Sequence, residues 1–256
     1  MAFVAAGDLR IHYRSAGTGE PVIFVHGNWA SSAWWELILA RLPAGYHGFA
    51  PDVRGRGETE GPDSDYRLPS LAADLLAFAD ALGLARFHLV GHSLGAGIAM
   101  QAALDAPARV TTLAVIAPPW ADGMPEELNM PDRQRLLKAQ PDLFRQAIKA
   151  MAPTAPENAY WELLVAEGHE QRLEAAIGSM VGLSEWKPGD RLASIPAPKL
   201  VIGGALDPLI AAEVVQRTAA ALGVEPVILE GVGHSPNVEA PDTLMALLAE
   251  HFRRSA

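Results

Sequence analysis

The sequence predicts an α/β fold with a mostly parallel central sheet of about eight strands, helices on both faces, and a helical cap inserted before the penultimate strand. Two observations lead to this prediction. Short apolar runs alternate with segments of helical periodicity along most of the 256 residues. This alternation is interrupted by one long stretch that has helical spacing and no strand-like run. Strands separated by helices form βαβ units, which place the strands parallel in one sheet.

Six apolar runs are typical of buried strands, because each is almost uniformly apolar and ends at Gly, Pro or Asp. These runs are 21–27, 46–52, 86–92, 109–118, 198–204 and 225–231. The N-terminal stretch Phe3–Tyr13 differs from them, since its apolar residues alternate with polar ones on either side of Gly7-Asp8. This pattern predicts an antiparallel hairpin at the edge of the sheet.

Helical patterns lie between these runs. Ser70 is expected to cap a helix whose apolar residues recur up to Leu82, and Ala211–Leu222 forms a second pattern. Pro241 is expected to begin a third helix, because proline is well suited to a first helical turn. Helices in these positions would cover the two faces of the sheet.

Residues 119–196 carry repeated prolines and apolar residues at helical spacing. They predict several short helices joined by proline turns. The expected division is therefore an α/β core formed by residues 1–118 and 197–256, with residues 119–196 as a cap or lid. The sequence does not distinguish a moving lid from helices that simply cover the sheet.

The composition excludes several classes of function. With 30 acidic and 20 basic residues the chain has a formal charge of −10, and no Lys/Arg block is present, so neither nucleic acid nor a membrane is an expected partner. The absence of cysteine excludes disulfides, thiolate metal sites and a cysteine nucleophile. The eight histidines show no paired ligand spacing, so neither a metal nor another cofactor is expected. No signal peptide or spanning segment is visible, which predicts a cytoplasmic protein and leaves its oligomeric state open.

The sharpest motif is Gly91-His92-Ser93-Leu94-Gly95, which directly follows the strand-like run 86–92 and precedes a small-residue stretch. A serine at a strand-to-helix turn adopts a strained backbone, and glycines two positions away on either side allow the close approach of strand and helix. The turn presents the hydroxyl beside a helix N-terminus, where a developing oxyanion is favoured. Ser93 is thus a candidate nucleophile, the alternative being that it merely caps the helix.

A serine nucleophile needs a base and an acid that orients the base. His234 follows the last predicted strand and Asp207 follows the penultimate one, so both are expected at the carboxyl edge of the sheet, with Asp122 as a reserve acid. His92 is a poor base for Ser93, because neighbouring side chains on a strand point to opposite faces.

The order Ser93, Asp207, His234 on a parallel sheet resembles the α/β-hydrolase superfamily, in particular its serine-nucleophile esterases, lactonases and perhydrolases with a helical cap. The segment 25–29, Val-His-Gly-Asn-Trp, is similar to the His-Gly segment that lines the oxyanion hole in this family. The resemblance implies that the backbone N–H groups of Asn28 and Leu94 bind the oxyanion. The loop 52–57 resembles the family's Asp-x-Arg-Gly-x-Gly loop, which we interpret as structural.

These features predict a serine hydrolase that cleaves small, fairly apolar carboxylic esters through an acyl-enzyme on Ser93. A lactonase, a C–C hydrolase or a cofactor-free perhydrolase would use the same triad, and a slow-turnover ligand-binding receptor could keep the same fold. The substrate, a small ester or lactone, is expected to lie between cap and sheet. Candidate lining residues are Trp29, Trp120, Trp186 and Met124.

Overall fold

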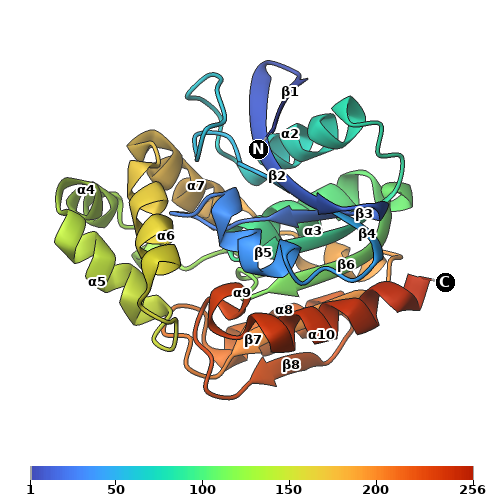
Figure 1. Ribbon diagram of the computed structural model, residues 1–256. Coiled ribbons are helices and arrows are strands. Elements are labelled where there is room, and N and C mark those ends of the chain that lie inside the picture. Colours follow the sequence, from blue (N-terminus) through green and yellow to red (C-terminus); the bar gives the residue numbers. More distant parts are fainter. Residues whose placement is uncertain (1, 256) are drawn as a thin grey trace.

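The computed structural model describes residues 2–255 and contains one eight-stranded sheet in the order β1-β2-β4-β3-β5-β6-β7-β8 (Figure 1). The first pairings, β1 with β2 and β2 with β4, are antiparallel, and all later ones are parallel. The strands are β1 (Ala2–Ala6), β2 (Leu9–Gly17), β3 (Gly19–Val25), β4 (Gly45–Pro51), β5 (Phe87–His92), β6 (Val110–Ile116), β7 (Lys199–Gly204) and β8 (Pro226–Leu229). The predicted fold class is confirmed.

The central strands are buried on both faces, which explains why their sequences are apolar without alternation. All six residues of β5 are buried. Ile23 and Leu89 pack into a core cluster on one face, whereas Phe24 and Val90 pack into a second cluster on the other face. Successive side chains of a strand point to opposite faces, so each central strand contributes to both clusters.

Helices cover each of these faces (Figure 1). The first cluster contains side chains of α2, α3 and α8, and the second contains side chains of α1 and α10. Their bounds are α1 (Glu36–Leu39), α2 (Leu68–Ala81), α3 (Leu94–Asp105), α8 (Ala212–Leu222), α9 (Pro236–Glu239) and α10 (Pro241–Phe252). None of the helices within residues 2–255 has the length and apolar character needed to cross a membrane.

Helix starts differ in one place from the sequence prediction. Helix α10 begins at Pro241 as expected, but α2 begins at Leu68, two residues before the expected cap Ser70. Pro69 occupies the first turn of α2, where its missing N–H costs nothing. The Ser70 hydroxyl instead donates a hydrogen bond to the carboxylate of Asp65, 2.5 Å away.

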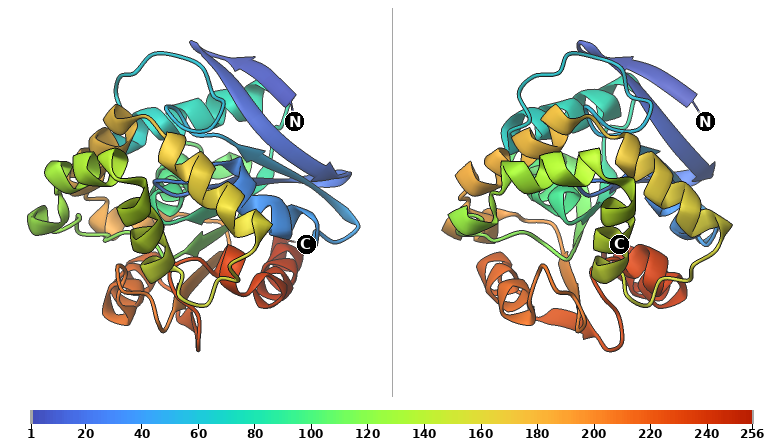
Figure 2. Two further views of the ribbon diagram at one scale, coloured as in Figure 1. Left: turned by 60° about the vertical axis from the view of Figure 1, so that its left-hand side comes forward. Right: turned by 90° about the vertical axis from the view of Figure 1, so that its left-hand side faces the viewer.

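Residues 119–196 form four α-helices and no strand. The helices are α4 (Pro131–Ala139), α5 (Pro141–Met151), α6 (Ala159–Glu170) and α7 (Leu173–Glu185). Figures 1 and 2 show them gathered on one side of the molecule. Their apolar faces form a third core cluster, in which Phe144 and Trp161 pack with Trp29 and Trp34 from the segment after β3. This third cluster joins the helical segment to the sheet.

Candidate active site

Ser93 occupies the sharp turn between β5 and α3. Its backbone has φ +55° and ψ −120°, a conformation that non-glycine residues rarely adopt. Such strain costs about 1–3 kcal/mol and persists only where the surroundings fix it. The N–H of Ser93 donates to the carbonyl of Ile116 on β6 at 2.9 Å, which attaches the turn to the neighbouring strand.

The glycines around Ser93 are required by close backbone contacts. A Cβ atom on Gly91 would lie 2.2 Å from the carbonyl oxygen of Gly95, and one on Gly95 would lie 2.2 Å from the carbonyl oxygen of Val25. On the facing loop, a Cβ atom on Gly27 would lie 3.1 Å from the Cβ of Ser93. The loop after β3 therefore lies directly against the candidate nucleophile.

His234 and Asp207 form a buried pair in the loops after β8 and β7. Nδ1 of His234 lies 2.7 Å from Oδ2 of Asp207, and the other oxygen of Asp207 accepts hydrogen bonds from the N–H groups of Leu209 and Ile210 at 2.8 and 2.9 Å. Burial opposes ionisation of Asp207, but the His234 ring and these two N–H groups outweigh it, so the pKa of the carboxyl lies below its ordinary value. The ring nitrogen facing Asp207 is thus the protonated one.

Ser93 and His234 line the same cavity. Among residues 2–255, Asp207 is the only hydrogen-bond partner of the His234 ring, and no hydrogen bond connects this ring with the Ser93 hydroxyl. Catalytic contacts of this kind are often loose without substrate and tighten when it binds. The reserve acid, Asp122, is exposed, and the ring of His234 is bonded to Asp207 instead.

The loop that carries His234 is held by the helical segment and by Glu239. The His234 N–H donates to the carbonyl of Met151, the last residue of α5, at 2.8 Å. The Glu239 carboxylate accepts hydrogen bonds from the N–H groups of Gly233 and Ser235 at 3.0 and 2.9 Å. Sequence reasoning did not find Glu239, because a carboxylate on a short helix carries no distinctive pattern.

The candidate oxyanion-binding residues are Asn28, in the segment after β3, and Leu94, directly after Ser93. Asn28 lines the cavity, and its side chain is occupied elsewhere, accepting hydrogen bonds from Arg56 Nη2 and Gln171 Nε2, both at 2.8 Å. Trp29 has φ +54°, and its N–H donates to Gln171 Oε1 at 2.6 Å. Leu94 is the first residue of α3, so its N–H has no partner within the helix. The Trp29 amide is therefore occupied, and the backbone N–H groups of Asn28 and Leu94 are the candidates for binding an oxyanion.

The cavity at Ser93 has a volume of about 130 Å³ and is mostly apolar. Trp29, Trp120 and Met124 line it, as do side chains from α4, α5 and α7. Two polar residues on α4 also line it, Arg133 and Gln134, and Gln134 accepts the indole N–H of Trp29 at 2.7 Å. No sequence pattern distinguishes these two from other polar residues on the outer face of a helix.

The expectation for Trp186 needs correction, since it does not line this cavity. Its indole packs into the first core cluster, and its N–H donates to Gln101 Oε1 on α3 at 2.9 Å. Trp186 directly follows α7, at the residue where the helix ends and the chain becomes extended. A tryptophan in a helical segment can face either the cavity or the core, and the sequence does not distinguish the two.

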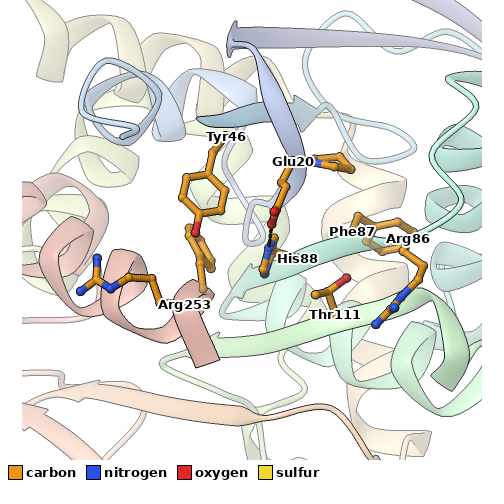
Figure 3. Close-up of a pocket in the computed structure, with 9 residues that line it drawn as sticks. Glu20, Tyr46, Arg86, Phe87, His88, Thr111 and Arg253 are labelled. Carbon is orange, nitrogen blue, oxygen red and sulfur yellow. Dashed lines mark hydrogen bonds and ion pairs between the residues drawn. The ribbon is translucent and has the colours of Figure 1, made fainter. Parts of the chain in front are cut away.

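A second hollow, of about 640 Å³, lies at the amino-terminal ends of the parallel strands, opposite to Ser93 (Figure 3). Phe87 and Thr111, near the amino ends of β5 and β6, line it together with the exposed Arg86. The ring of His88 bonds to Thr112 Oγ1 at 2.9 Å and to Glu20 at 3.2 Å, so both of its nitrogens are occupied. Although larger, this hollow brings no nucleophile together with a free base, and ligands of such sheets bind at the carboxyl edge. Within residues 2–255, no group of three or more His, Asp or Glu side chains is placed to hold a metal ion.

The chain is similar to several known proteins over most of its length. Residues 22–247 match the family described as "Alpha/beta hydrolase family". RutD of Klebsiella pneumoniae (strain 342), which is named for carbamate hydrolysis, is 32% identical over 245 residues, 91% of each chain. An N-formylmaleamate deformylase of Pseudomonas putida is 41% identical over 118 residues, 45% of this chain and 44% of that protein. The solved structure of Est816, described as an N-acyl homoserine lactone degrading enzyme, has a TM-score of 0.83 and 26% identity over 97% of this chain and 99% of that one.

Proposed function

Because the chain belongs to the alpha/beta hydrolase family, we propose that it is a serine hydrolase that cleaves small, fairly apolar carboxylic esters through an acyl-enzyme on Ser93. The family match confirms the resemblance found in the motifs. One observation carries the proposal: the strained Ser93 turn and the buried His234–Asp207 pair meet at a single apolar cavity. Residues 119–196 act in this proposal as the cap that closes the cavity.

The proposed reaction starts with attack of Ser93 Oγ on the ester carbonyl, while Nε2 of His234 takes the hydroxyl proton. Asp207 keeps the ring in the required tautomer and stabilises its cation. The N–H groups of Asn28 and Leu94 bind the oxyanion. The alcohol leaves with the proton from His234, and water, activated by the same ring, then releases the acid and restores Ser93.

A fluorophosphonate probe followed by peptide mapping tests this mechanism. The probe should label Ser93, and Ser93→Ala should abolish both the labelling and the hydrolysis of p-nitrophenyl butyrate. Labelling of a different residue would overturn the mechanism. Negligible turnover combined with strong thermal stabilisation by a bound ester would instead favour a receptor.

Cleavage of a C–N bond is the second candidate, because the two relatives of highest identity named above are a protein named for carbamate hydrolysis and a deformylase. The same serine chemistry applies, with an amine in place of the alcohol as leaving group. A matched panel of an ester, a lactone, an N-formyl amide and a carbamate, each compared by kcat/KM, separates the candidates. Preference for the formyl amide or carbamate would replace the ester proposal and retain Ser93 as the nucleophile.

A further inference from the structure

Arg56 is a buried cation whose bonded acceptors are all uncharged. Only 1% of the residue is exposed, and burial lowers its pKa to about 9, which leaves it charged at neutral pH. Its guanidinium donates to the carbonyl of Arg54 at 2.9 Å, to Asn28 Oδ1 at 2.8 Å, and to Ser179 Oγ and the Ala175 carbonyl on α7 at 2.7 and 3.3 Å. A buried cation that lacks a carboxylate partner is costly, so stability alone does not account for it.

Gln171, in the turn between α6 and α7, also contacts Asn28 and its neighbour Trp29. It is 1% exposed, donates to Asn28 Oδ1 and accepts the N–H of Trp29. The Asn28 side-chain amide in turn donates to the carbonyl of Ala176 at 3.3 Å. Arg56 and Gln171 thus share one acceptor, and Asn28 is bonded on its side chain alone to three different partners.

We propose that Arg56 and Gln171 are positioning residues that hold the Asn28–Trp29 segment so that the backbone N–H of Asn28 faces the oxyanion formed on Ser93. This inference rests on the proposed function and adds the residues that assemble its oxyanion hole. Gln171 also takes up the N–H of Trp29, the amide next in the chain, so that the Asn28 amide alone of the two is left for the substrate.

The local backbone explains why such support is needed. Trp29 is held at φ +54°, which a large side chain adopts only under constraint, and Gly27 leaves no spare room beside Ser93. A displacement of about 1 Å in a catalytic donor can cost about 100-fold in rate. Two side chains that together make three hydrogen bonds to the Asn28–Trp29 segment prevent such a displacement. The positive charge of Arg56, placed on the side chain of Asn28, also favours an anion nearby.

Four variants test the proposal. Arg56→Met and Gln171→Met remove the contacts. Arg56→Lys can still donate to Asn28 Oδ1, and Gln171→Glu can still accept the N–H of Trp29, so each keeps part of them. Arg54→Met is the matched control: Arg54 lies in the same loop, but its guanidinium binds both oxygens of Asp74 at 2.7 Å. The control should lower the melting temperature and leave kcat within about twofold of the wild type.

Steady-state kinetics and a trifluoromethyl ketone, which forms a tetrahedral adduct with the serine, give the readouts. We expect Arg56→Met and Gln171→Met to lower kcat about 10- to 100-fold with KM within about threefold. The inhibition constant of the ketone should rise by the same factor as kcat falls, and the Lys and Glu variants should lie between these values and the wild type. The midpoint of the acid limb of the pH profile, which reports the base, should stay in place.

An unchanged kcat in all four variants, or a rise of KM alone, would overturn the inference while leaving the function intact. A loss of kcat without weaker ketone binding would also overturn it, because the oxyanion contact would then be unaffected. If the wild type shows no turnover that depends on Ser93, the proposed function itself is refuted, and this outcome is distinct from those above.

Discussion

Nε2 of His92 donates a hydrogen bond to the backbone carbonyl of His234 at 2.8 Å. His92 is the last residue of β5 and directly precedes Ser93, so this contact joins the strand that carries the candidate nucleophile to the loop that carries the candidate base. Burial, together with the nearby His234 ring, lowers the pKa of His92 to about 3, so the ring stays neutral. With Nε2 as donor to the carbonyl, His92 supports His234 and does not compete with it as a base.

His92→Phe should therefore reduce activity through the position of His234. We expect kcat to fall about 10-fold, because the His234 loop loses one of its attachments while the ring and Asp207 remain. His92→Asn supplies a side-chain amide donor and should recover part of the loss. Equal kcat in the wild type and the Phe variant, measured with p-nitrophenyl butyrate, would show that the contact does not position the base.

The pH dependence of kcat/KM should show a single acid limb. Activity should rise with pH to a plateau, since only a neutral imidazole base accepts the serine proton. The lowered pKa of Asp207 keeps its carboxylate ionised between pH 5 and 9, and His26 and His92, with pKa values of about 4 and 3, stay neutral there. A stopped-flow or plate assay over this range measures the profile, and a flat one would contradict the assignment of the base.

Asp207→Asn should lower kcat by about 10⁴-fold, because an amide at this position favours the wrong tautomer of His234. Asp122→Asn, which changes an exposed carboxylate away from the ring, should keep nearly full activity. Titration of active sites with the fluorophosphonate probe corrects both values for inactive protein. The reverse result would identify Asp122 as the orienting acid.

Gly95→Ala should prevent correct folding or destabilise the protein by more than about 3 kcal/mol, because the added Cβ would lie 2.2 Å from the Val25 carbonyl oxygen. Gly83→Ala is the control: Gly83 has φ +69° and nothing within 4 Å of the added atom, so only backbone strain of about 1 kcal/mol applies. Urea unfolding of both variants gives the comparison. Equal losses would mean that the close contact of loop and helix does not limit this position.

Stability should fall in mild acid because His26 is buried and neutral. Its Nδ1 donates to the Gly27 carbonyl at 2.8 Å and its Nε2 accepts the N–H of Val53 at 3.0 Å. A second proton on Nε2 would replace this acceptor by a donor that faces the Val53 N–H. Burial lowers its pKa to about 4, whereas in the unfolded chain the ring binds a proton near pH 6.5. The unfolded state therefore binds more protons between these values, and the free energy of unfolding should fall from pH 6.5 to about 4, by roughly 3 kcal/mol from His26.

Urea unfolding at pH 7.5 and 5 measures this dependence. His26→Asn, whose side-chain oxygen can accept the Val53 N–H, is the matched variant and should show a smaller difference between the two pH values. An identical difference in both proteins would mean that His26 does not contribute to the acid sensitivity.

The sequence was sufficient for the fold and for the carboxyl-edge residues, because both follow from local patterns. A uniformly apolar run followed by a short loop places Asp207 and His234 at the same edge wherever the helices lie. The predicted cap of α2 was wrong by three residues, since the helix is preceded by Arg67 and already includes Leu68 and Pro69. Local capping rules do not account for such tertiary effects.

The supports of the site were not predictable, because they depend on contacts between distant segments. The sequence indicated only that the loop 52–57 is structural. In the structure Arg54 pairs with Asp74, and Asp52 lies 2.6 Å from His12 Nδ1 and accepts the N–H of Glu58 at 3.0 Å. Arg56 in the same loop reaches Asn28, and Gln171 reaches it from a segment more than a hundred residues further on. No periodicity or motif marks such partners before the chain is folded.

The backbone contact between His234 and Met151 restricts how substrate can reach Ser93. Met151 ends α5 and accepts the N–H of His234, and Gln171, between α6 and α7, donates to the side chain of Asn28. The helical segment therefore contacts both the loop that carries the candidate base and the Asn28–Trp29 segment. An outward movement of all four helices as one body would break both contacts, and the loop of His234 and the Asn28–Trp29 segment would lose their support. Any path of substrate to Ser93 that preserves both contacts must therefore leave α5 and the α6–α7 turn in place.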